Sequence, residues 1–266
     1  MKKRNWNLRI GCCITGVLVL MIIVGIFWTP YEPNAMSSAD KQMAPCLAHL
    51  FGTDQFGRDI FSRVLEGGRT SLFIAVCTVA IGAGVGIVVG SLTGYFGGWL
   101  DEVLMRLNDS VAAFPSILLA LVCVSVFGSG KYKIILTLGI LFIPSFARIV
   151  RGEFVKERNR DYVENAKIMG AGPFRILFAH ILPNVKTVLM SSMAIGFNNA
   201  VLAEASMSYL SMGVQPPDAS LGRMLSESQS ALFTTPWYAI CTGTFLVLLI
   251  LGISLVGQGL QEREDL

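Results

Sequence analysis

Six long runs of apolar residues divide this sequence, and each run contains few or no charges. A helix needs about 20 apolar residues to cross the hydrocarbon layer of a membrane. Inside lipid, every backbone polar group must find a partner within the protein, so each run is predicted to be helical. The sequence therefore predicts an all-α integral membrane protein with six transmembrane helices. The six predicted spans cover residues 10–28, 71–96, 103–127, 134–150, 185–210 and 237–256.

The low charge content argues against a soluble protein. Only 15% of the residues are charged, and the mean hydropathy is +0.61. Soluble domains carry about 25% charged residues. A large soluble helical protein would not need so few charges, so the membrane interpretation is preferred.

The first apolar run has two interpretations. It follows basic residues at 2–4 and Arg9, as the apolar core of a cleaved signal peptide would. The run is long for a signal core, however, and no clean small-x-small cleavage site precedes Pro30. A retained helix is therefore favoured, with a cleaved signal peptide as the alternative.

The distribution of basic residues predicts the orientation in the membrane. With six spans, both chain ends lie on one side, and this side holds fourteen Lys and Arg residues against seven on the other. Among the fourteen are Lys2, Lys3, Arg4 and Arg263. Because cytoplasmic loops carry the excess of Lys and Arg, both termini are predicted to be cytoplasmic, together with residues 151–184.

Residues 151–184 form a polar segment between the fourth and fifth predicted spans. Residues 153–169 contain few helix breakers, and Arg160 and Glu164 have the i, i+4 spacing of a helical ion pair. Gly170 then permits a turn that other residues resist. The pattern predicts two short helices lying across the cytoplasmic surface, with a tight corner between them.

The second of these helices is predicted to begin at Pro173, a favoured first residue of a helix, and to end at Pro183 before the membrane. Its apolar side chains are Phe174, Ile176, Leu177, Phe178 and Ile181. An ordinary solvated loop is the alternative, but such a loop has no reason to carry these side chains. Ala166 is small and is expected to let a partner surface approach, while Glu164 is expected to hold the corner through nearby backbone or Arg160.

The spacing of seven residues in this segment resembles the coupling loop of ABC importer permeases. They are Glu164, Asn165, Ala166, Gly170, His180, Leu182 and Pro183. The family pattern is Glu-Ala-Ala, three residues, Gly, nine residues, Ile, one residue and Leu-Pro. The chain departs from it where Asn165 replaces the middle alanine and His180 replaces the isoleucine. The resemblance implies an ABC importer type I permease fold in which this loop, 151–184, seats in a groove on a cytoplasmic ATPase.

Three further stretches resemble the dipeptide, oligopeptide and nickel branch of these importers, and within it the second of two paired permeases. They are residues 49–72, 94–109 and 202–225. The resemblance implies half of a translocation path for short peptides, with nickel or a metal–chelator complex as the alternative solute. The implied partners, in a prokaryotic cell membrane, are a homologous second permease, two cytoplasmic ABC ATPases and an extracytoplasmic solute-binding protein.

The sequence lacks the motifs of an ATPase or a metalloenzyme. It has no Gly-x4-Gly-Lys-Ser/Thr phosphate loop, so ATP and Mg²⁺ are expected on partner subunits, with no cofactor in this chain. His49 and His180 are predicted to lie on opposite sides of the membrane, and the six cysteines lack metal-ligand spacing. No catalytic or metal site is predicted.

Polar residues in the fifth predicted span are candidates for the translocation path. They are Asn198, Asn199 and Glu204. Family resemblance places this span beside the path, and Glu204 is expected either to pair with a neighbouring helix or to line the path. An ion-driven secondary transporter or channel, the alternative from another class, would carry charges in several spans. Glu204 is the sole clear intramembrane charge away from a helix end, which favours the importer permease.

Glycines recur through the second predicted span and predict close packing against another helix. They are Gly82, Gly84, Gly86, Gly90 and Gly94. A Gly-x-Gly pattern can also indicate nucleotide binding, but here no strand accompanies it and the run lies in the membrane.

The chain is divided into a first helix with an extracytoplasmic loop (1–66), a transmembrane core (67–260) and a cytoplasmic tail (261–266). Within 51–68, apolar residues at helical spacing predict an amphipathic helix. It is expected to cover the bundle, to lie on the membrane surface or to meet an external partner. The candidate contacts for the binding protein are Asp54, Arg58, Asp59 and Arg63.

Overall fold

The computed structural model describes residues 6–264, and their side chains up to residue 261. The basic residues Lys2, Lys3 and Arg4, on which part of the predicted orientation rests, lie outside these residues, as does the side chain of Arg263. The long helices are α1 (Trp6–Phe27), α2 (Ile60–Phe96), α3 (Gly98–Ala112), α4 (Ser116–Phe127), α5 (Lys131–Glu157), α8 (Leu182–Tyr209) and α10 (Pro236–Glu264). The short ones are α6 (Asp161–Ile168), α7 (Pro173–Arg175), the π-helix η1 (Ile176–Ile181), α9 (Leu221–Ser228) and the 3-10 helix η2 (Gln229–Ala231).

Five helical segments of the described chain are long and apolar enough to cross a membrane: α1, α2, α5, the continuous stretch Pro173–Tyr209, and α10 up to Gln261. The span predicted over 103–127 is not one straight helix but the pair α3 and α4, bent by 91°. Pro115 stands at the N-cap of α4, and the residue before a proline is disfavoured in the helical conformation. The six predicted spans are therefore five unbroken helices and one broken helix.

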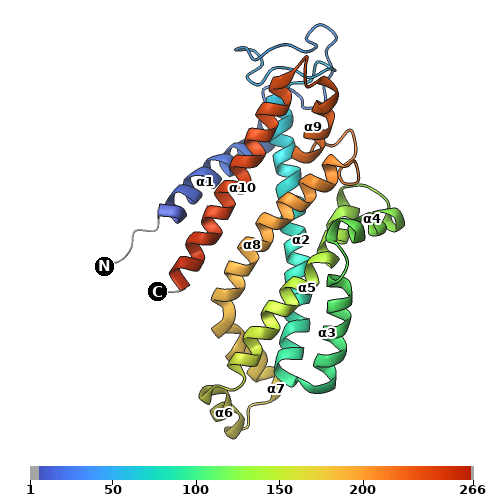
Figure 1. The fold of residues 1–266 in the computed structure, drawn as a ribbon. Coiled ribbons are helices and arrows are strands. Elements are labelled where there is room, and N and C mark those ends of the chain that lie inside the picture. The colour runs from blue at the N-terminus through green and yellow to red at the C-terminus, as the bar shows by residue number, and fades with distance from the viewer. Residues whose placement is uncertain (1–5, 265–266) are drawn as a thin grey trace.

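The helices form an elongated bundle in which α2, α5 and α8 run along the long axis (Figure 1). α1 and α10 pack against each other on one flank, and α3 runs beside α5. The loop before α2 lies at one end of the bundle together with α9, and α6 and α7 lie at the opposite end. These are named the α9 end and the α6 end. The N-terminal end of α1 and the C-terminal end of α10 both point away from the α9 end (Figure 1).

The glycines of α2 lie against α5. A Cβ added to Gly86 would lie 2.6 Å from the Cβ of Phe146, and real Cβ atoms do not approach so closely. Gly82, Gly90 and Gly94 meet α5 in the same way, whereas Gly84 has open space around it. Because residues four apart share one helix face, these four glycines form one contact surface. The predicted close packing is confirmed for four of the five glycines.

α2 begins at Ile60, well before the predicted start of its span. Asp59 is the N-cap, and its carboxylate accepts a hydrogen bond from the Ser62 N–H at 2.8 Å. The amphipathic helix predicted within 51–68 is thus the first part of α2 rather than a separate surface helix. Ile60 and Val64 belong to the main hydrophobic core, so this part of α2 is buried in the bundle.

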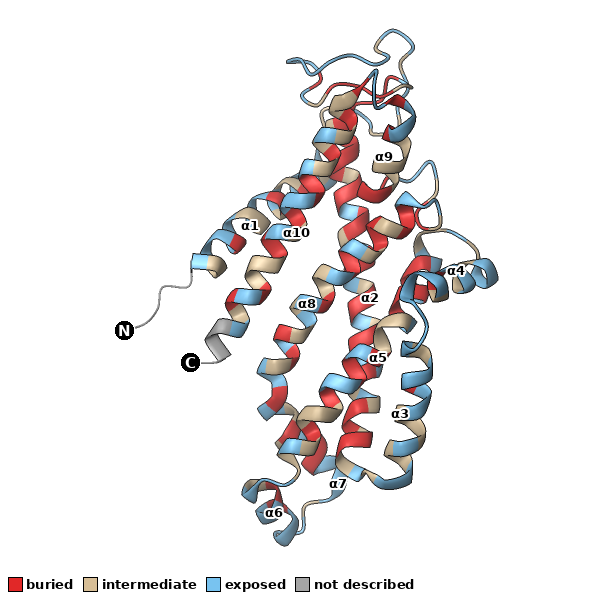
Figure 2. Cartoon of the chain, viewed as in Figure 1, coloured by how far each residue is buried: buried red, intermediate tan, exposed pale blue. Residues whose placement is uncertain are grey.

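Apolar side chains cover much of the outer surface, as a membrane protein requires. Figure 2 shows exposed residues along α1, α4 and α10. Phe27, Val122, Val126 and Val247 are among the exposed apolar side chains. Lipid tails are as apolar as these side chains, so such faces suit lipid or a partner helix.

Candidate functional site

The polar segment between α5 and α8 (residues 158–181) folds into a helical corner at the α6 end. After α6, Gly170 has a φ of +80°, in the region that favours glycine. The Gly170 N–H donates to the Lys167 carbonyl at 2.9 Å. The Ala171 N–H donates to the Ala166 carbonyl, also at 2.9 Å. This pair of bonds is a Schellman motif, so the predicted break at Gly170 is confirmed.

The second helix of the corner begins at Pro173, as predicted, but it does not end at Pro183. It continues through the π-helix Ile176–Ile181 into α8. Proline lacks an N–H, and in an α-helix its ring clashes with the carbonyl four residues earlier. The π-helical turns that directly precede Pro183 alter this hydrogen-bond ladder and allow a continuous helix. The predicted helix end at Pro183 is therefore wrong.

The corner shares a hydrophobic core with the ends of α5 and α8. This cluster comprises Val150, Phe154, Val163, Ala166, Ile176, Leu177, Ile181, Val185 and Leu189. Ala166 therefore faces inward, which corrects the expectation that it would lie on a partner-facing surface. The Tyr162 hydroxyl donates to the Glu157 carboxylate at 2.8 Å, and burial raises the pKa of Tyr162, which keeps it a donor. The corner is a folded part of the bundle.

Four apolar side chains of the corner are exposed to its outside. The exposed fractions of Ile168 and Met169 are 84% and 88%, and that of Phe174 is 64%. Phe178 is also exposed. These four residues are named the corner patch. An exposed apolar patch with a polar rim marks a protein-interaction site.

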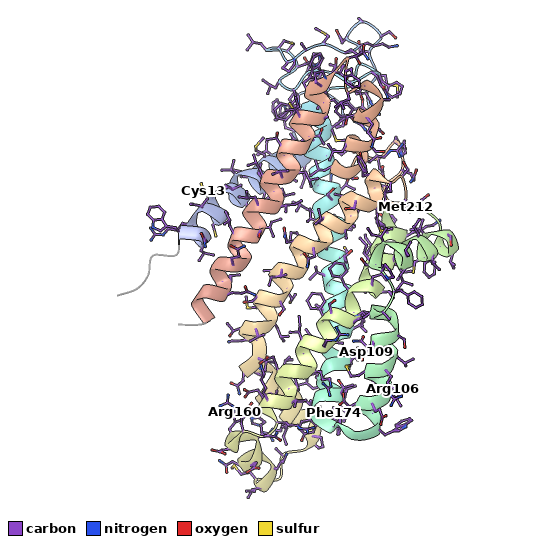
Figure 3. The ribbon with its side chains drawn as sticks, in the orientation of Figure 1. Cys13, Arg106, Asp109, Arg160, Phe174 and Met212 are labelled. Carbon is purple, nitrogen blue, oxygen red and sulfur yellow. The ribbon has the colours of Figure 1, made fainter. Side chains whose placement is uncertain are left out.

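Further residues of the predicted coupling pattern are exposed in and directly after the corner. Glu164 and Asn165 are exposed on α6, and Pro183 is exposed at the start of α8. Arg160 and Phe174 both lie at the α6 end (Figure 3). His180 and Leu182 are half-buried in the continuing helix.

The expected contact between Glu164 and Arg160 is replaced by another. The Arg160 Nε atom lies 3.5 Å from a carboxylate oxygen of Glu157, three residues before it. Glu164 keeps the helical hydrogen bond from its own N–H to the Arg160 carbonyl, at 3.3 Å. Its carboxylate thus stands on the exposed face of α6.

A groove of about 430 Å³ opens between α4, α5 and α8. Its walls are mostly apolar, and none of its lining residues is charged. Its polar side chains are Ser116, Ser145, Ser192, Asn199 and Ser206. Of the predicted path residues, Asn199 lines this groove, and Asn198 and Glu204 do not.

Glu204 is fully buried near the α9 end of α8. Its carboxylate accepts a hydrogen bond from the Ser208 hydroxyl at 2.7 Å. That hydroxyl accepts in turn from the Val214 N–H at 3.1 Å, in the loop that leads to α9. Glu204 is thus tied to α8 and, through Ser208, to the loop before α9, and its pairing with a neighbouring helix or its place on the path stays a prediction.

The four residues predicted to contact a binding protein are all buried: Asp54, Arg58, Asp59 and Arg63. Arg58 donates to Asp54 at 2.6 Å and to Glu227 of α9 at 2.9 Å. Arg63 lies 3.4 Å from the same Glu227 oxygen. Burial by itself lowers the pKa of Arg58, but the two carboxylates outweigh this effect and the pKa is raised. Asp54, Arg58 and Arg63 form an internal network with Glu227 that joins the segment around the start of α2 to α9. Asp59 instead lies 2.9 Å from His49.

Sequence reasoning missed Glu227 and the polar contacts between α3 and α5. Arg151 donates two hydrogen bonds to Asp101, at 2.5 and 2.7 Å, and Asn108 donates to the Pro144 carbonyl at 3.0 Å. The seven-residue spacing of Asp101 and Asn108 was a usable signal, because it places both on one helix face.

Within the described residues, no group of three His, Cys, Asp or Glu side chains could hold a metal ion.

A bundle of five unbroken spans and one broken span, with a folded helical corner between two of them, defines a membrane-embedded transport subunit. The chain belongs to the family described as the inner membrane component of binding-protein-dependent transport systems, whose model matches residues 86–264. It is the permease subunit of an ABC importer, a non-enzymatic membrane component. Members of this family work with ATPase and binding-protein partners.

The chain is similar to named permeases over most of its length. It is 39% identical over 257 residues to the glutathione transport system permease protein GsiD of Pectobacterium atrosepticum, covering 94% of this chain and 85% of the relative. It is 34% identical over 269 residues to the dipeptide transport system permease protein DppC of Haemophilus influenzae, covering 99% and 91%. The fold matches the MetNI methionine ABC transporter in an inward-facing conformation, with a TM-score of 0.58, 17% identity and coverage of 74% and 96%.

Proposed function

We propose that this permease forms half of a path for short peptides, paired with a homologous second permease. Two relatives named for their solutes carry a dipeptide and glutathione, which is itself a short peptide. The uncharged groove suits this solute class, because serine and asparagine side chains can bond peptide groups whatever the peptide's side chains. In this proposal, Asn199 contacts the solute, and Asn198 and Glu204 support the helix that carries it.

The proposed coupling role rests on the corner patch. It exposes Ile168, Met169 and Phe174 on a base that is packed into the bundle, so it can receive a partner without unfolding. We assign this surface, together with the exposed Glu164 and Asn165 of α6, to one of two cytoplasmic ATPases. ATP would draw the docked corners of the two permeases together, and ends of α5 and α8 would move with them. The α6 end and both termini are then cytoplasmic.

The opposite end receives the solute-binding protein in this proposal. The buried network around Glu227 holds the loop before α2 against α9, and this arrangement leaves other side chains exposed. Leu47 and Phe233 are each 99% exposed there. Asp54, Arg58, Asp59 and Arg63 therefore serve the docking surface by fixing its shape.

The assembly is tested by purifying the tagged chain from its native membrane. A second permease and ATPases should copurify, and the associated binding protein should carry a short peptide. A transport-competent homo-oligomer without ATPases would contradict the proposed assembly. If the binding protein carries nickel or a metal chelate, that solute replaces the peptide in this proposal. If it carries a sugar, the proposed solute class is wrong.

A further inference from the structure

α3 packs on the bundle through an apolar face that is only half-buried, and polar contacts to α5 add to this packing. Its single buried residue is Asn108, and Leu100, Val103 and Leu104 are half-buried. A helix in a bundle is normally held by a stripe of apolar side chains. Because no apolar side chain of α3 is fully buried in the described chain, the polar contacts to α5 also help to fix its position.

Two of these contacts involve partly or fully buried groups on α5. Arg151 binds both carboxylate oxygens of Asp101, at 2.5 and 2.7 Å. Two parallel hydrogen bonds to a carboxylate fix both distance and orientation. Further along α3, the Asn108 side chain donates to the Pro144 carbonyl at 3.0 Å.

A third contact extends this line. Asp109 of α3, which follows Asn108, accepts a hydrogen bond from Arg148 at 2.7 Å. Asp109 and Arg106 both lie on α3 (Figure 3), but Arg106 pairs within that helix, with Glu102 at 2.6 Å. Asp101–Arg151, Asn108–Pro144 and Asp109–Arg148 are named the α3–α5 seam.

On α5 the seam begins at Pro144, among residues that line the groove, and ends at Arg151, three residues before Phe154 of the corner core. Phe154 of α5 is part of the core of the corner, so α5 is directly joined to the proposed docking surface. α3 bends by 91° into α4 beyond residue 112, and Ser116 of α4 lines the groove. A displacement of the corner can thus pass through α5 and the seam to α3, while the bend absorbs the change in direction.

We infer that Asp101 and Arg151 are positioning residues for transport, which make α3 follow α5 when the corner moves. This inference rests on the proposed coupling of the corner to an ATPase. The pair does not touch the groove. Its contribution lies in how much solute is moved for each ATP hydrolysed.

The test uses the complete importer in lipid vesicles, with its binding protein and a dipeptide as the probe solute. The variants are Arg151→Asp, Asp101→Arg and the exchanged pair that combines them. Each single variant places like charges together, and we expect it to lower dipeptide uptake per ATP by about tenfold, the size of a typical coupling contribution. ATP hydrolysis in the absence of dipeptide should continue. The exchanged pair should recover most of the lost uptake, because the two sites act on each other.

A matched control exchanges Glu102 and Arg106, an exposed ion pair on the same helix. This exchange should leave uptake per ATP unchanged. The inference is overturned if the single variants keep the wild-type ratio, or if the exchanged pair at 101 and 151 recovers nothing. If the wild-type importer shows no dipeptide-dependent ATP hydrolysis, the proposed function itself fails, which is a different outcome.

Discussion

Gly86 of α2 lies directly against Phe146 of α5, where an added Cβ would come within 2.6 Å of the phenylalanine Cβ. The same contact recurs along the two helices at Gly82, Gly90 and Gly94. Within lipid, helices associate through close packing rather than through the hydrophobic effect. The α2–α5 contact is therefore expected to be a main source of stability in this fold.

Replacing Gly86 with leucine should destabilise the folded chain. The new side chain would have to displace Phe146, and overpacking of this kind costs about 1–3 kcal/mol. Thermal unfolding of the purified protein in detergent measures this effect, and the midpoint should fall. Gly84→Leu is the control, since nothing lies within 4 Å of its Cβ position. Equal midpoints for the two variants would show that the α2–α5 contact does not limit stability.

Replacing Glu227 with glutamine should loosen the α9 end. Arg58 and Arg63 would lose their shared carboxylate. Because Arg58 keeps Asp54 and Arg63 keeps Asn34, the cost should be smaller than the about 3–5 kcal/mol of a buried charge left without a partner. Proteolysis of the loop before α2 should become faster, and the unfolding midpoint should fall. Glu102→Gln, in an exposed pair, should change neither quantity. A loop as resistant in Glu227→Gln as in wild type would argue against the network.

Apolar runs and the glycine spacing were sufficient to predict the helical bundle, because lipid leaves the backbone few alternatives. The bend between α3 and α4 was missed because the apolar run passes through Pro115 without interruption. At Pro183 the error was the opposite one: a helix end was predicted where the helix continues. The π-helical turns before this proline are a local adjustment that composition does not encode.

Arg58, just before α2, and Arg63, in the first turn of α2, show where sequence patterns stop being informative. The apolar residues around them have helical spacing, which predicted an amphipathic helix, but both arginines pair with Glu227, which lies far away in the sequence. Such a pairing depends on the tertiary fold. The Gly170 corner, by contrast, is a local motif of glycine and its neighbours and was predictable.

Replacing Phe174 with serine should weaken the binding of the ATPase without affecting the fold. Phe174 is 64% exposed, so its loss leaves the interior unchanged. An aromatic anchor at a protein interface contributes on the order of 2 kcal/mol, or about thirtyfold in affinity. Titration of the purified ATPase onto the chain in nanodiscs measures this constant. The control is Tyr132→Ser, at an exposed aromatic residue on α5, which should bind the ATPase with wild-type affinity. Wild-type affinity in Phe174→Ser would show that the corner patch is not the docking surface.

The coupling role of the corner can be tested at Gly170, where the backbone turn favours glycine. A valine at φ +80° is strained by about 1–2 kcal/mol, whereas Gly172 has an extended backbone at φ −68° that accepts valine. Both positions have open space for a side chain, so the two variants differ in backbone strain alone.

The decisive measurement is dipeptide-stimulated ATP hydrolysis, with uptake followed in parallel, for Gly170→Val and Gly172→Val in the reconstituted importer. Both variants should insert into the membrane, since no span is altered. Stimulation and uptake should fall together in Gly170→Val and stay near wild type in Gly172→Val. Wild-type stimulation and uptake in Gly170→Val would contradict the account, as would loss of that variant from the membrane.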